Sequence, residues 1–485
     1  MAKIVIIGGG VSGLSAGIYA QLSGHEAVVC ERQAMAGGNL TGWQRGEYHI
    51  DNCIHWLTGT NPASDEYKTW TELGALGGVA IHQPDSLYTY EEDGKQLSLS
   101  RNLSVFREEM LKISPADEKE ILALCKAIER IQEMWGIGGE NHDEKSSRLQ
   151  DLLKLPFLVR YYRWTTGDLA KRFQNPFLQN FITSMLGDKF ASLALLIVAA
   201  TFCGDNGGIP KGSSLAMAKR MSARFLSLGG KLRLKCEAEK IETENGKATA
   251  VFFSNGEKET ADYVVIACDP AVVFKKMLDI PLPKQLEKQY SNPAMPRFSS
   301  YQCALACDEK KLPFTHDFIF RLPAKHQKKL HSKTLILREF SHEKSFAPKG
   351  KSLLQTLTFC TEKESLKFIK LRKDKPAYDE KKKQIADTMV EIITEKFPQL
   401  KGKLHPIDVW TPATYKRYTD SETGSYMSFL LPPNIFPKAV DNRVKSLKNV
   451  FLATQWQQAP GGLPIAAKVG KRVIERINRK EKVQK

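Results

Sequence analysis

The sequence lacks an apolar run long enough to cross a bilayer. The longest run, from Phe190 to Phe202, is interrupted by Ser192 and is shorter than the roughly 20 residues that a spanning helix needs. The first apolar segment begins at Lys3, which leaves no room before it for a signal peptide. We therefore expect neither a spanning helix nor a signal peptide.

Paired cysteines are also missing. The nine cysteines are never spaced as C-x-x-C, and Cys30 and Cys268 fall in segments that we expect to be buried strands. They are typical of reduced core thiols, and so indicate a cytoplasmic protein. Cys303 and Cys307 make up at most half of a metal site, because no second pair or histidine cluster completes it. We expect core packing there and no metal.

Acidic residues are few relative to basic ones. The chain has 71 Lys and Arg against 54 Asp and Glu, a net charge of +17, and residues 310–375 alone hold 17 basic and 6 acidic residues. Nucleic-acid-binding motifs are absent, so we expect no nucleic-acid partner. Phe314, Phe318, Ile319 and Phe320 alternate with these lysines, and two explanations stay open: a solvated basic face, or a surface that contacts an anionic membrane.

What the sequence does contain is a dinucleotide-binding unit in its first 38 residues. An apolar run over residues 3–7 predicts a strand buried on both faces, and Gly8, Gly10 and Gly13 follow it in G-x-G-x-x-G spacing. The first glycine makes a tight turn, the second lets backbone approach a pyrophosphate, and the third lets a helix pack closely on the strand. The N-terminal N–H groups of that helix favour phosphate.

The second predicted strand, over residues 26–30, ends at Glu31. A carboxylate at this position accepts hydrogen bonds from the hydroxyls of an adenosine ribose and repels a 2′-phosphate, which leaves FAD or NAD. Arg32 follows, and then a second glycine pair, Gly37 and Gly38. An ordinary structural turn is the alternative explanation for this pair.

The remainder of the chain predicts an α/β fold with a buried parallel sheet. Residues 61–205 read as mainly helical, and the apolar run within them predicts either a core helix or the wall of an apolar substrate tunnel. Residues 207–270 predict a helix, two hairpins at Asn-Gly pairs and a further buried strand. A lysine-rich segment over 271–444 contains an amphipathic helix at 379–397. A last strand, 449–453, precedes a helix that opens near Gly461.

Three blocks of the chain together resemble one enzyme family. The G-G-G-V-S-G turn with Glu31 and the second glycine pair, residues 207–270, and residues 449–473 are similar to the phytoene desaturase, carotenoid cis-trans isomerase and retinol saturase family of FAD-dependent oxidoreductases, within the amine-oxidase-like superfamily. The resemblance implies a Rossmann-type, GR2-like FAD-binding domain made of residues 1–60, 207–270 and 445–485. It implies a discontinuous α+β substrate and membrane-facing domain made of residues 61–206 and 271–444.

The resemblance also implies where FAD binds. The family usually has arginine after the second glycine pair, and this chain has Asn39, so one phosphate or ribose contact is expected to differ. The helix start near Gly461 lies under the flavin pyrimidine ring in the family, where N–H groups stabilise the negative charge of reduced flavin. The implied FAD contacts are Gly8, Gly10, Val11, Ser12, Gly13, Glu31, Arg32, Gly37, Gly38, Asn39, Gly461, Gly462, Leu463 and Pro464.

The family places the segment after the second glycine pair near the flavin ring. Asp51, His55 and Trp56 thereby become candidates for the catalytic wall. His55 has two explanations of similar weight, a proton-transfer group or a hydrogen-bonded core histidine.

By resemblance, the expected function is an FAD-dependent desaturase or saturase that acts on C–C or C=C bonds of a long apolar substrate such as a polyisoprenoid, carotenoid or retinoid. A hydride moves to or from flavin N5 while a proton is handled nearby. The chain has no second G-x-G-x-x-G, so the electron acceptor is a quinone, oxygen or a carrier. Two alternatives stay open: a redox-neutral FAD-dependent isomerase, and a flavin-free prenyl- or lipid-binding protein similar to Rab GDP-dissociation inhibitors.

Overall fold

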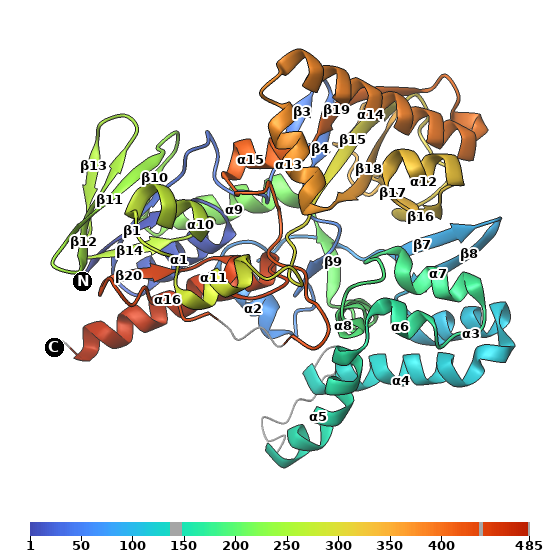
Figure 1. The fold of residues 1–485 in the computed structure, drawn as a ribbon, viewed down its shortest axis with the longest axis horizontal. Coiled ribbons are helices and arrows are strands. Elements are labelled where there is room, and N and C mark those ends of the chain that lie inside the picture. Colours follow the sequence, from blue (N-terminus) through green and yellow to red (C-terminus); the bar gives the residue numbers. More distant parts are fainter. Residues whose placement is uncertain (136–147, 436–439, 484–485) are drawn as a thin grey trace.

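The chain folds around two large sheets, one parallel and one mixed (Figure 1). The structure is a computed structural model that describes residues 1–135, 148–435 and 440–483. Five short strands form two further small sheets. They are β3 (Gly42–Arg45), β4 (Tyr48–Asp51), β5 (Leu57–Thr58), β6 (Ile81–His82) and β9 (Gly207–Pro210). In these sheets β3 pairs with β4, and β9 pairs with β5 and β6.

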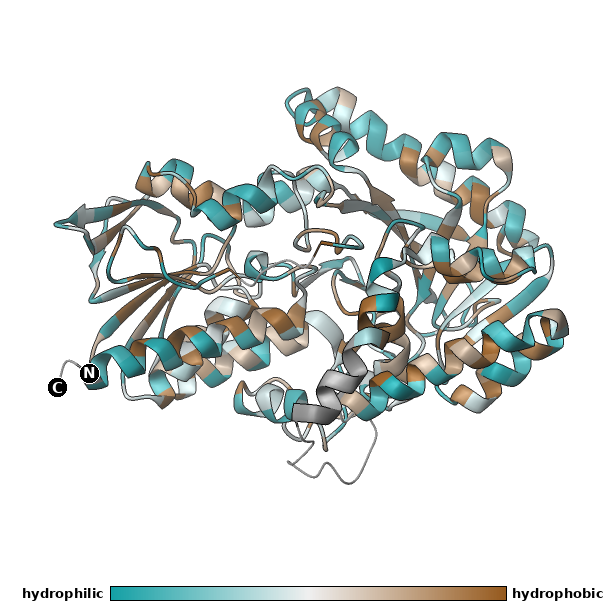
Figure 2. Cartoon of the chain, turned by 60° about the horizontal axis from the view of Figure 1, so that its bottom comes forward, coloured by the Kyte–Doolittle hydropathy of each residue, from teal (hydrophilic) through white to brown (hydrophobic). Residues whose placement is uncertain are grey.

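The parallel sheet has the strand order β10-β2-β1-β14-β20. Its strands come from the start, the middle and the end of the sequence, and each reads as a continuous apolar run because both faces are covered. In Figure 2 the strands drawn beside the mark N are accordingly brown, the colour of hydrophobic residues, along most of their length. The bounds are β1 (Lys3–Ile7), β2 (Glu26–Cys30), β10 (Lys231–Arg233), β14 (Tyr263–Ile266) and β20 (Val450–Leu452).

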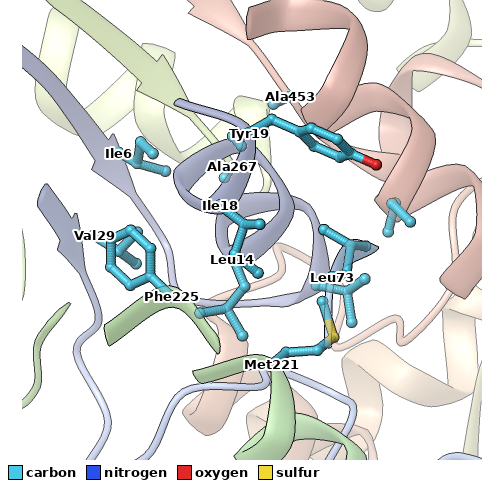
Figure 3. Packing of buried hydrophobic residues seen from close by; sticks show 14 of the residues in the cluster. Ile6, Leu14, Ile18, Tyr19, Val29, Leu73, Met221, Phe225, Ala267 and Ala453 are labelled. Atoms are coloured by element: carbon cyan, nitrogen blue, oxygen red, sulfur yellow. The ribbon is translucent and has the colours of Figure 1, made fainter. Parts of the chain in front are cut away.

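Helices cover one face of this sheet. Leu14 and Ile18 of the first helix pack near Phe225, Met221 and Leu73 from two others (Figure 3). The first helix also lies directly against the last: a Cβ on Gly470 would stand 2.6 Å from the carbonyl oxygen of Ser12. The helices are α1 (Val11–Leu22), α2 (Asp65–Glu72), α9 (Ser213–Ser227) and α16 (Leu463–Val483).

An antiparallel meander covers the other face. Its first turn places Asn245 at φ 50° and Gly246 at φ 73°, the left-handed conformations that the Asn-Gly pair predicted. Short helices continue the layer. The bounds are β11 (Ala238–Glu244), β12 (Lys247–Phe253), β13 (Lys258–Thr260), α10 (Pro270–Val273), a π-helical turn (Phe274–Leu278) and α11 (Lys284–Tyr290).

The mixed sheet has the order β19-β15-β18-β17-β16-β7-β8. All its neighbours are antiparallel except β16 and β7. The strands are β7 (Ser86–Glu92), β8 (Lys95–Ser100), β15 (Ser299–Cys307), β16 (Asp317–Arg321), β17 (Thr334–Glu339), β18 (Ser352–Cys360) and β19 (Leu404–Trp410).

The expectation that residues 61–205 are mainly helical is wrong for β7 and β8. Asp93 and Gly94, with φ of 51° and 80°, form the hairpin turn between them. Asp-Gly between two alternating segments is a strong hairpin signal, and the sequence analysis overlooked it.

Helices pack on both faces of the mixed sheet. On one face the apolar run predicted from the sequence is a helix, α8, and on the other the predicted amphipathic stripe of α14 is buried through Ile385, Met389, Ile392 and Ile393. Both predictions are confirmed. The helices are α3 (Leu103–Ile113), α4 (Glu118–Trp135), α5 (Arg148–Arg163), α6 (Thr166–Ala170), α7 (Pro176–Ser184), α8 (Ser192–Cys203), α12 (Ala324–Leu330), α13 (Glu362–Leu371), α14 (Lys375–Lys396) and α15 (Pro412–Thr419).

The four apolar residues of the basic segment that were considered for membrane contact do not face solvent. Phe314, Phe318, Ile319 and Phe320 are each 7% exposed or less, in the cores on either side of the mixed sheet. The expectation that they form a membrane-facing surface is therefore wrong, because their alternation with lysines reflects strand pairing and helix packing. Among the described helices, none is long and apolar enough to span a bilayer.

The nine cysteines are all free. Cys303 and Cys307 lie buried on β15 in the core of the mixed sheet, which confirms the prediction that they serve core packing.

Candidate functional site

The turn between β1 and α1 is built so that only glycine fits at two of its positions. Gly8 has a φ of 106°, and a Cβ on Gly13 would stand 1.9 Å from the carbonyl oxygen of Gly8. Gly10 differs, because its φ is −71° and the nearest atoms to a Cβ there lie 4.0 Å away. The fold does not require glycine at position 10. Its missing side chain instead leaves open space beside the backbone.

The space above Gly10 is suited to an anion. Gly10 gives α1 no side-chain cap, so the N–H groups at the start of the helix, including those of Val11 and Ser12, line the cavity with their positive dipole end. The second glycine pair packs against this turn, since Gly37 N donates to the Gly9 carbonyl at 2.8 Å.

Glu31 is fixed beside the same turn. Its Oε2 accepts from Gly9 N at 2.9 Å and its Oε1 from Gln33 N at 2.8 Å. Burial raises the pKa of the Glu31 carboxyl, and the two backbone donors oppose that rise. The side chain is buried at the cavity wall, where a carboxylate is placed to accept from sugar hydroxyls.

Two neighbouring side chains take other partners. Asn39 Nδ2 donates to the Tyr426 carbonyl at 3.3 Å. Arg32 lies 3.5 Å from a carboxylate oxygen of Glu237 and 3.7 Å from one of Asp420. Both Asn39 and Arg32 line the cavity.

The last helix begins at the same cavity. Gly461 and Gly462 have φ of 81° and 97°, and Gly462 N donates to Gln455 Oε1 at 3.0 Å. Leu463 and Pro464 then start α16 on the cavity wall, where the missing N–H of proline costs nothing. Two helix N-termini, of α1 and α16, therefore meet one cavity from opposite ends of the chain.

The cavity has a volume of about 1280 Å³, which exceeds the roughly 300–1,000 Å³ of an ordinary small-molecule site. Its polar part is the glycine turns with Glu31. Its apolar part, which we call the chamber, lies between α8 and the mixed sheet and is lined by Leu87, Tyr88, Tyr90, Met185, Ala194, Ile197, Val198, Ile319, Ile336 and Leu357. The volume has room for a nucleotide cofactor and a second, apolar molecule.

Helix α8 faces two apolar environments. One face packs in the core through Leu195, Leu196 and Phe202, and the other lines the chamber through Ala194, Ile197 and Val198. The sequence left a core helix and a tunnel wall as alternatives, and α8 takes both positions.

His55 and Trp56 line the cavity as expected. His55 Nδ1 lies 2.8 Å from Asp317 Oδ2, and the His55 and Trp56 rings are 6.5 Å apart, edge to face. Asp51 is a correction: it is fully buried and its carboxylate accepts from Ser214 N and Ser214 Oγ, each at 2.9 Å. It holds the start of α9 in place instead of facing the cavity.

Sequence reasoning missed the partners of His55. Asp317 begins β16, and Arg338 stands directly across from it on β17. Arg338 Nε donates to Asp317 Oδ1 at 3.1 Å, and its Nη2 donates to the Ile54 carbonyl at 2.6 Å. No local signal could reveal this group, because 262 residues separate His55 from Asp317.

The charges of this group are coupled. Burial by itself would raise the pKa of the Asp317 carboxyl, but His55 and Arg338 hold that pKa well below its usual range. Burial, and next the Arg338 charge, lower the pKa of His55 despite Asp317. The group is therefore an ionised Asp317–Arg338 pair beside a neutral imidazole.

Comparisons with known proteins agree with this geometry. Residues 11–478 match the family described as flavin containing amine oxidoreductase. Prolycopene isomerase 1 of the chloroplast, from an Oncidium hybrid cultivar, is 23% identical over 452 residues, covering 87% of this chain and 74% of the relative. The 4,4′-diaponeurosporene oxygenase of Staphylococcus aureus (strain MW2) is 22% identical over 508 residues, covering 99% and 98%.

Solved structures share the fold. An oxidoreductase from Methanosarcina mazei superposes with a TM-score of 0.62 at 18% identity, covering 98% of this chain and 100% of the other. Cyclohexylamine oxidase from Brevibacterium oxydans IH-35A superposes with a TM-score of 0.61 at 14% identity, covering 99% of each chain. At these identities the likeness establishes the α/β fold with its parallel sheet and mixed sheet.

The family match covers nearly the whole described chain, and both glycine turns and both helix N-termini that a dinucleotide needs lie on one cavity. The chain belongs to the flavin containing amine oxidoreductase family of enzymes, and membership of that family implies FAD as the cofactor.

Proposed function

We propose that this protein is an FAD-dependent oxidoreductase that acts on C–C or C=C bonds of a long apolar substrate, such as a polyisoprenoid, carotenoid or retinoid. The observation that carries the proposal is the single cavity of about 1280 Å³ that joins the glycine turns to the apolar chamber. Under this proposal residues 1–60, 207–270 and 445–485 hold FAD, and residues 61–206 and 271–444 form the substrate part.

The cofactor half of the proposal rests on the donors and the space at the turns. The N–H groups of Gly10, Val11 and Ser12 would hold the pyrophosphate, and Glu31 the ribose. The start of α16 at Leu463 would lie under the flavin ring. Gly37, Gly38, Asn39 and Arg32 complete the wall of this part of the cavity.

The substrate half rests on the chamber. Its wall is made of aliphatic and aromatic side chains from α8, the mixed sheet and Met185, which follows α7. Such a surface binds hydrocarbon by removing it from water. The named relatives support the same class, because prolycopene and diaponeurosporene are long polyenes.

FAD, when bound, supplies a hydride acceptor or donor. The chain's own residues do the rest: the chamber aligns one substrate bond with the ring and excludes water. His55 and Trp56 line the same cavity. His55 Nε2 is the ring nitrogen left for a proton, because Nδ1 is engaged by Asp317.

A redox-neutral isomerase is the second candidate, and the prolycopene isomerases among the relatives favour it. Product mass separates the two candidates. We expect the purified protein to be yellow, to release FAD on denaturation, and to convert a polyene into a product that differs by two hydrogen atoms. Unchanged mass with altered double-bond geometry would instead establish the isomerase.

A colourless protein that cannot be reconstituted with FAD, yet retains a prenyl lipid after purification, would contradict both candidates. That result would favour the flavin-free lipid-binding alternative.

We also propose that the opening of the chamber rests on an anionic membrane. Lys189, Lys333 and Phe359 line the cavity and are exposed. Phe359 is the last residue but one of β18, and α13 follows that strand with an exposed Leu366. Three exposed lysines lie on α13 at helical spacing, namely Lys363, Lys367 and Lys370. Apolar side chains surrounded by lysines suit an interface with anionic lipid.

We expect the triple variant Lys363→Glu, Lys367→Glu, Lys370→Glu to lose vesicle binding. At about 1 kcal/mol per lysine, partitioning onto vesicles of mixed zwitterionic and anionic lipid should fall about a hundredfold. Co-sedimentation measures the effect. The matched control changes Lys240, Lys247 and Lys258 of the distant meander to Glu (Figure 1). Equal losses in both variants would show that only net charge matters and would contradict docking through α13.

A further inference from the structure

Four histidines lie near the buried Asp317–Arg338 pair or stack on a histidine near it, and they range from the cavity wall to an exposed position. His55 lines the cavity, His316 directly precedes Asp317, and His342 lies four residues beyond Arg338. The fourth, His82 on β6, is exposed and stacks on His342 with ring centroids 4.7 Å apart and planes 6° from parallel. Four of the ten histidines of the chain thus gather around one buried ion pair.

The ion pair fixes His55. An ionised Asp317 at 2.8 Å from Nδ1 requires a proton on that nitrogen, so the neutral ring exposes an unprotonated Nε2. Arg338 is 2% exposed and holds Asp317 from the other side, and its charge opposes a second proton on His55. The chain therefore presents a neutral proton acceptor at the cavity wall.

Two buried polar atoms beside the Asp317–Arg338 pair have no hydrogen-bond partner among the described residues. Among the described residues no group bonds Arg338 Nη1 or His316 Nε2, although both side chains are more than nine-tenths buried. His316 also has a φ of 54°, a conformation that costs a non-glycine residue free energy and clusters at functional sites. Buried polar atoms of this kind are commonly satisfied by ordered water.

Ring contacts link Arg338, through Phe340 and His342, to the exposed His82. Arg338 lies over the Phe340 ring at 4.9 Å, and the Phe340 and His342 rings are 6.2 Å apart. Burial is the largest cause that lowers the pKa of His342 to about 3, and the positive charge of Arg338 acts in the same direction. Burial likewise lowers the pKa of His82 and that of His316. These rings are neutral near pH 7, so each has one nitrogen to accept a proton and one to give.

Acidic groups also border this path. Glu339 Oε1 accepts from His316 N at 2.9 Å, and Glu343 Oε1 accepts from Gly212 N at 2.7 Å. Both carboxylates are thus tied to backbone, and together with Asp317 they offset the positive charge of a proton passing among the rings.

We propose that Asp317 and Arg338 are positioning residues that keep His55 a neutral proton acceptor with Nε2 toward the chamber, and that His316, His342 and His82 exchange its proton with solvent. The inference rests on the proposed oxidoreductase function. It accounts for the proton that leaves an apolar, water-excluding chamber.

The step balances in the oxidising direction. Oxidised FAD, when bound, would supply the acceptor for the hydride that one substrate carbon loses. The neighbouring carbon loses a proton to His55 Nε2, and the electron pair of that second C–H bond becomes the new C=C bond. The proton then leaves through the histidines, and saturation runs the same steps backwards.

The positioning role is tested by NMR of protein labelled with ¹⁵N-histidine, with the His55 signals assigned by their absence in His55→Gln. We expect a neutral His55 with the proton on Nδ1, and a pKa below the usual histidine range. Arg338→Met should raise that pKa, because a positive charge is removed while Asp317 remains. Asp317→Asn should lower it and abolish the single tautomer.

Kinetics provide the second readout. The acid limb of kcat/KM should move to higher pH in Arg338→Met and to lower pH in Asp317→Asn, with KM nearly unchanged. His55→Gln should lower kcat by about 10²–10⁴-fold. An unchanged tautomer and unchanged pH profile in Asp317→Asn would overturn the positioning role.

The path to solvent is tested with His342→Phe, which keeps a flat ring against His82. We expect kcat to fall about tenfold or more and to recover when imidazole is added as a small proton carrier. His405→Phe, which removes an exposed histidine bonded to Asp308, is the control and should change nothing. Wild-type kcat in His342→Phe, without dependence on buffer, would overturn the path.

Flavin content separates this proposal from the proposed function. If the variants and the wild type all lack FAD, the oxidoreductase proposal fails, while the tautomer and the pKa of His55 still decide the positioning role. If FAD is bound and the substrate is turned over, the pH profiles decide the inference alone.

Discussion

Replacing Gly10 by alanine should weaken FAD binding and leave the fold intact. The φ of −71° at Gly10 suits any residue, and a Cβ would meet its nearest protein atoms only at 4.0 Å. The same Cβ would stand where the pyrophosphate crosses the start of α1. Overpacking of about 1–3 kcal/mol corresponds to a loss of about tenfold to over a hundredfold in FAD affinity.

Gly13→Ala should behave differently. Its Cβ would stand 1.9 Å from the Gly8 carbonyl oxygen, and backbone cannot move aside as a flexible side chain can. We expect a loss of more than about 3 kcal/mol in the free energy of unfolding. Gly77→Ala is the control, because its closest contact would be the Thr71 methyl group at 3.4 Å.

Thermal unfolding followed by circular dichroism, and FAD titration followed by flavin fluorescence, separate these effects. Gly10→Ala should unfold like the apoprotein of the wild type and bind FAD weakly. Full FAD affinity in Gly10→Ala would contradict the position assigned to the pyrophosphate and, with it, the cofactor half of the proposed function.

Filling the chamber should abolish turnover without affecting FAD. Ala194 lies on the chamber face of α8, and Ala194→Trp would place an indole where the apolar substrate is proposed to lie. Misplacing a substrate by about 1 Å is enough to cost about a hundredfold in rate. We therefore expect kcat/KM for a long polyene to fall at least about a hundredfold, with unchanged flavin content.

Two control variants are compared with Ala194→Trp. Ala194→Val should have an intermediate effect because it adds less volume, and Leu122→Trp adds the same indole at an exposed position of α4 and should have none. Turnover and FAD content are measured on the same preparations. Normal turnover in Ala194→Trp would place the substrate elsewhere and contradict the chamber as its site.

The cofactor cradle could be predicted from the sequence because its parts are local. The first 31 residues contain the strand, the glycine turn, the helix and Glu31. Only glycine fits at Gly8, because of its positive φ, and at Gly13, because of its close contact with the Gly8 carbonyl. The structure confirms β1 and β2 at the predicted bounds. The hairpin at Asn245 was equally local and equally predictable.

The errors share a cause. The alternation of lysines with Phe314 and Phe318 looked like a surface, but these rings are buried because β16 lies inside a seven-stranded sheet. Asp51 became a catalytic candidate because the family resemblance places its segment near the flavin ring. Its carboxylate instead holds Ser214, 163 residues away, since β4 ends against the start of α9.

The sequence by itself determined the parallel sheet, the glycine turns and the family resemblance that implied FAD, because short-range geometry restricts which residues those features accept. Only the tertiary structure decided that both helix N-termini share one cavity with the chamber, and that Asp317 and Arg338 stand behind His55. Asp317 and Arg338 pair across adjacent strands 21 residues apart, but His55 lies 262 residues from Asp317 in the sequence. Tertiary packing, which no local pattern specifies, brings His55 within hydrogen-bond distance of that pair.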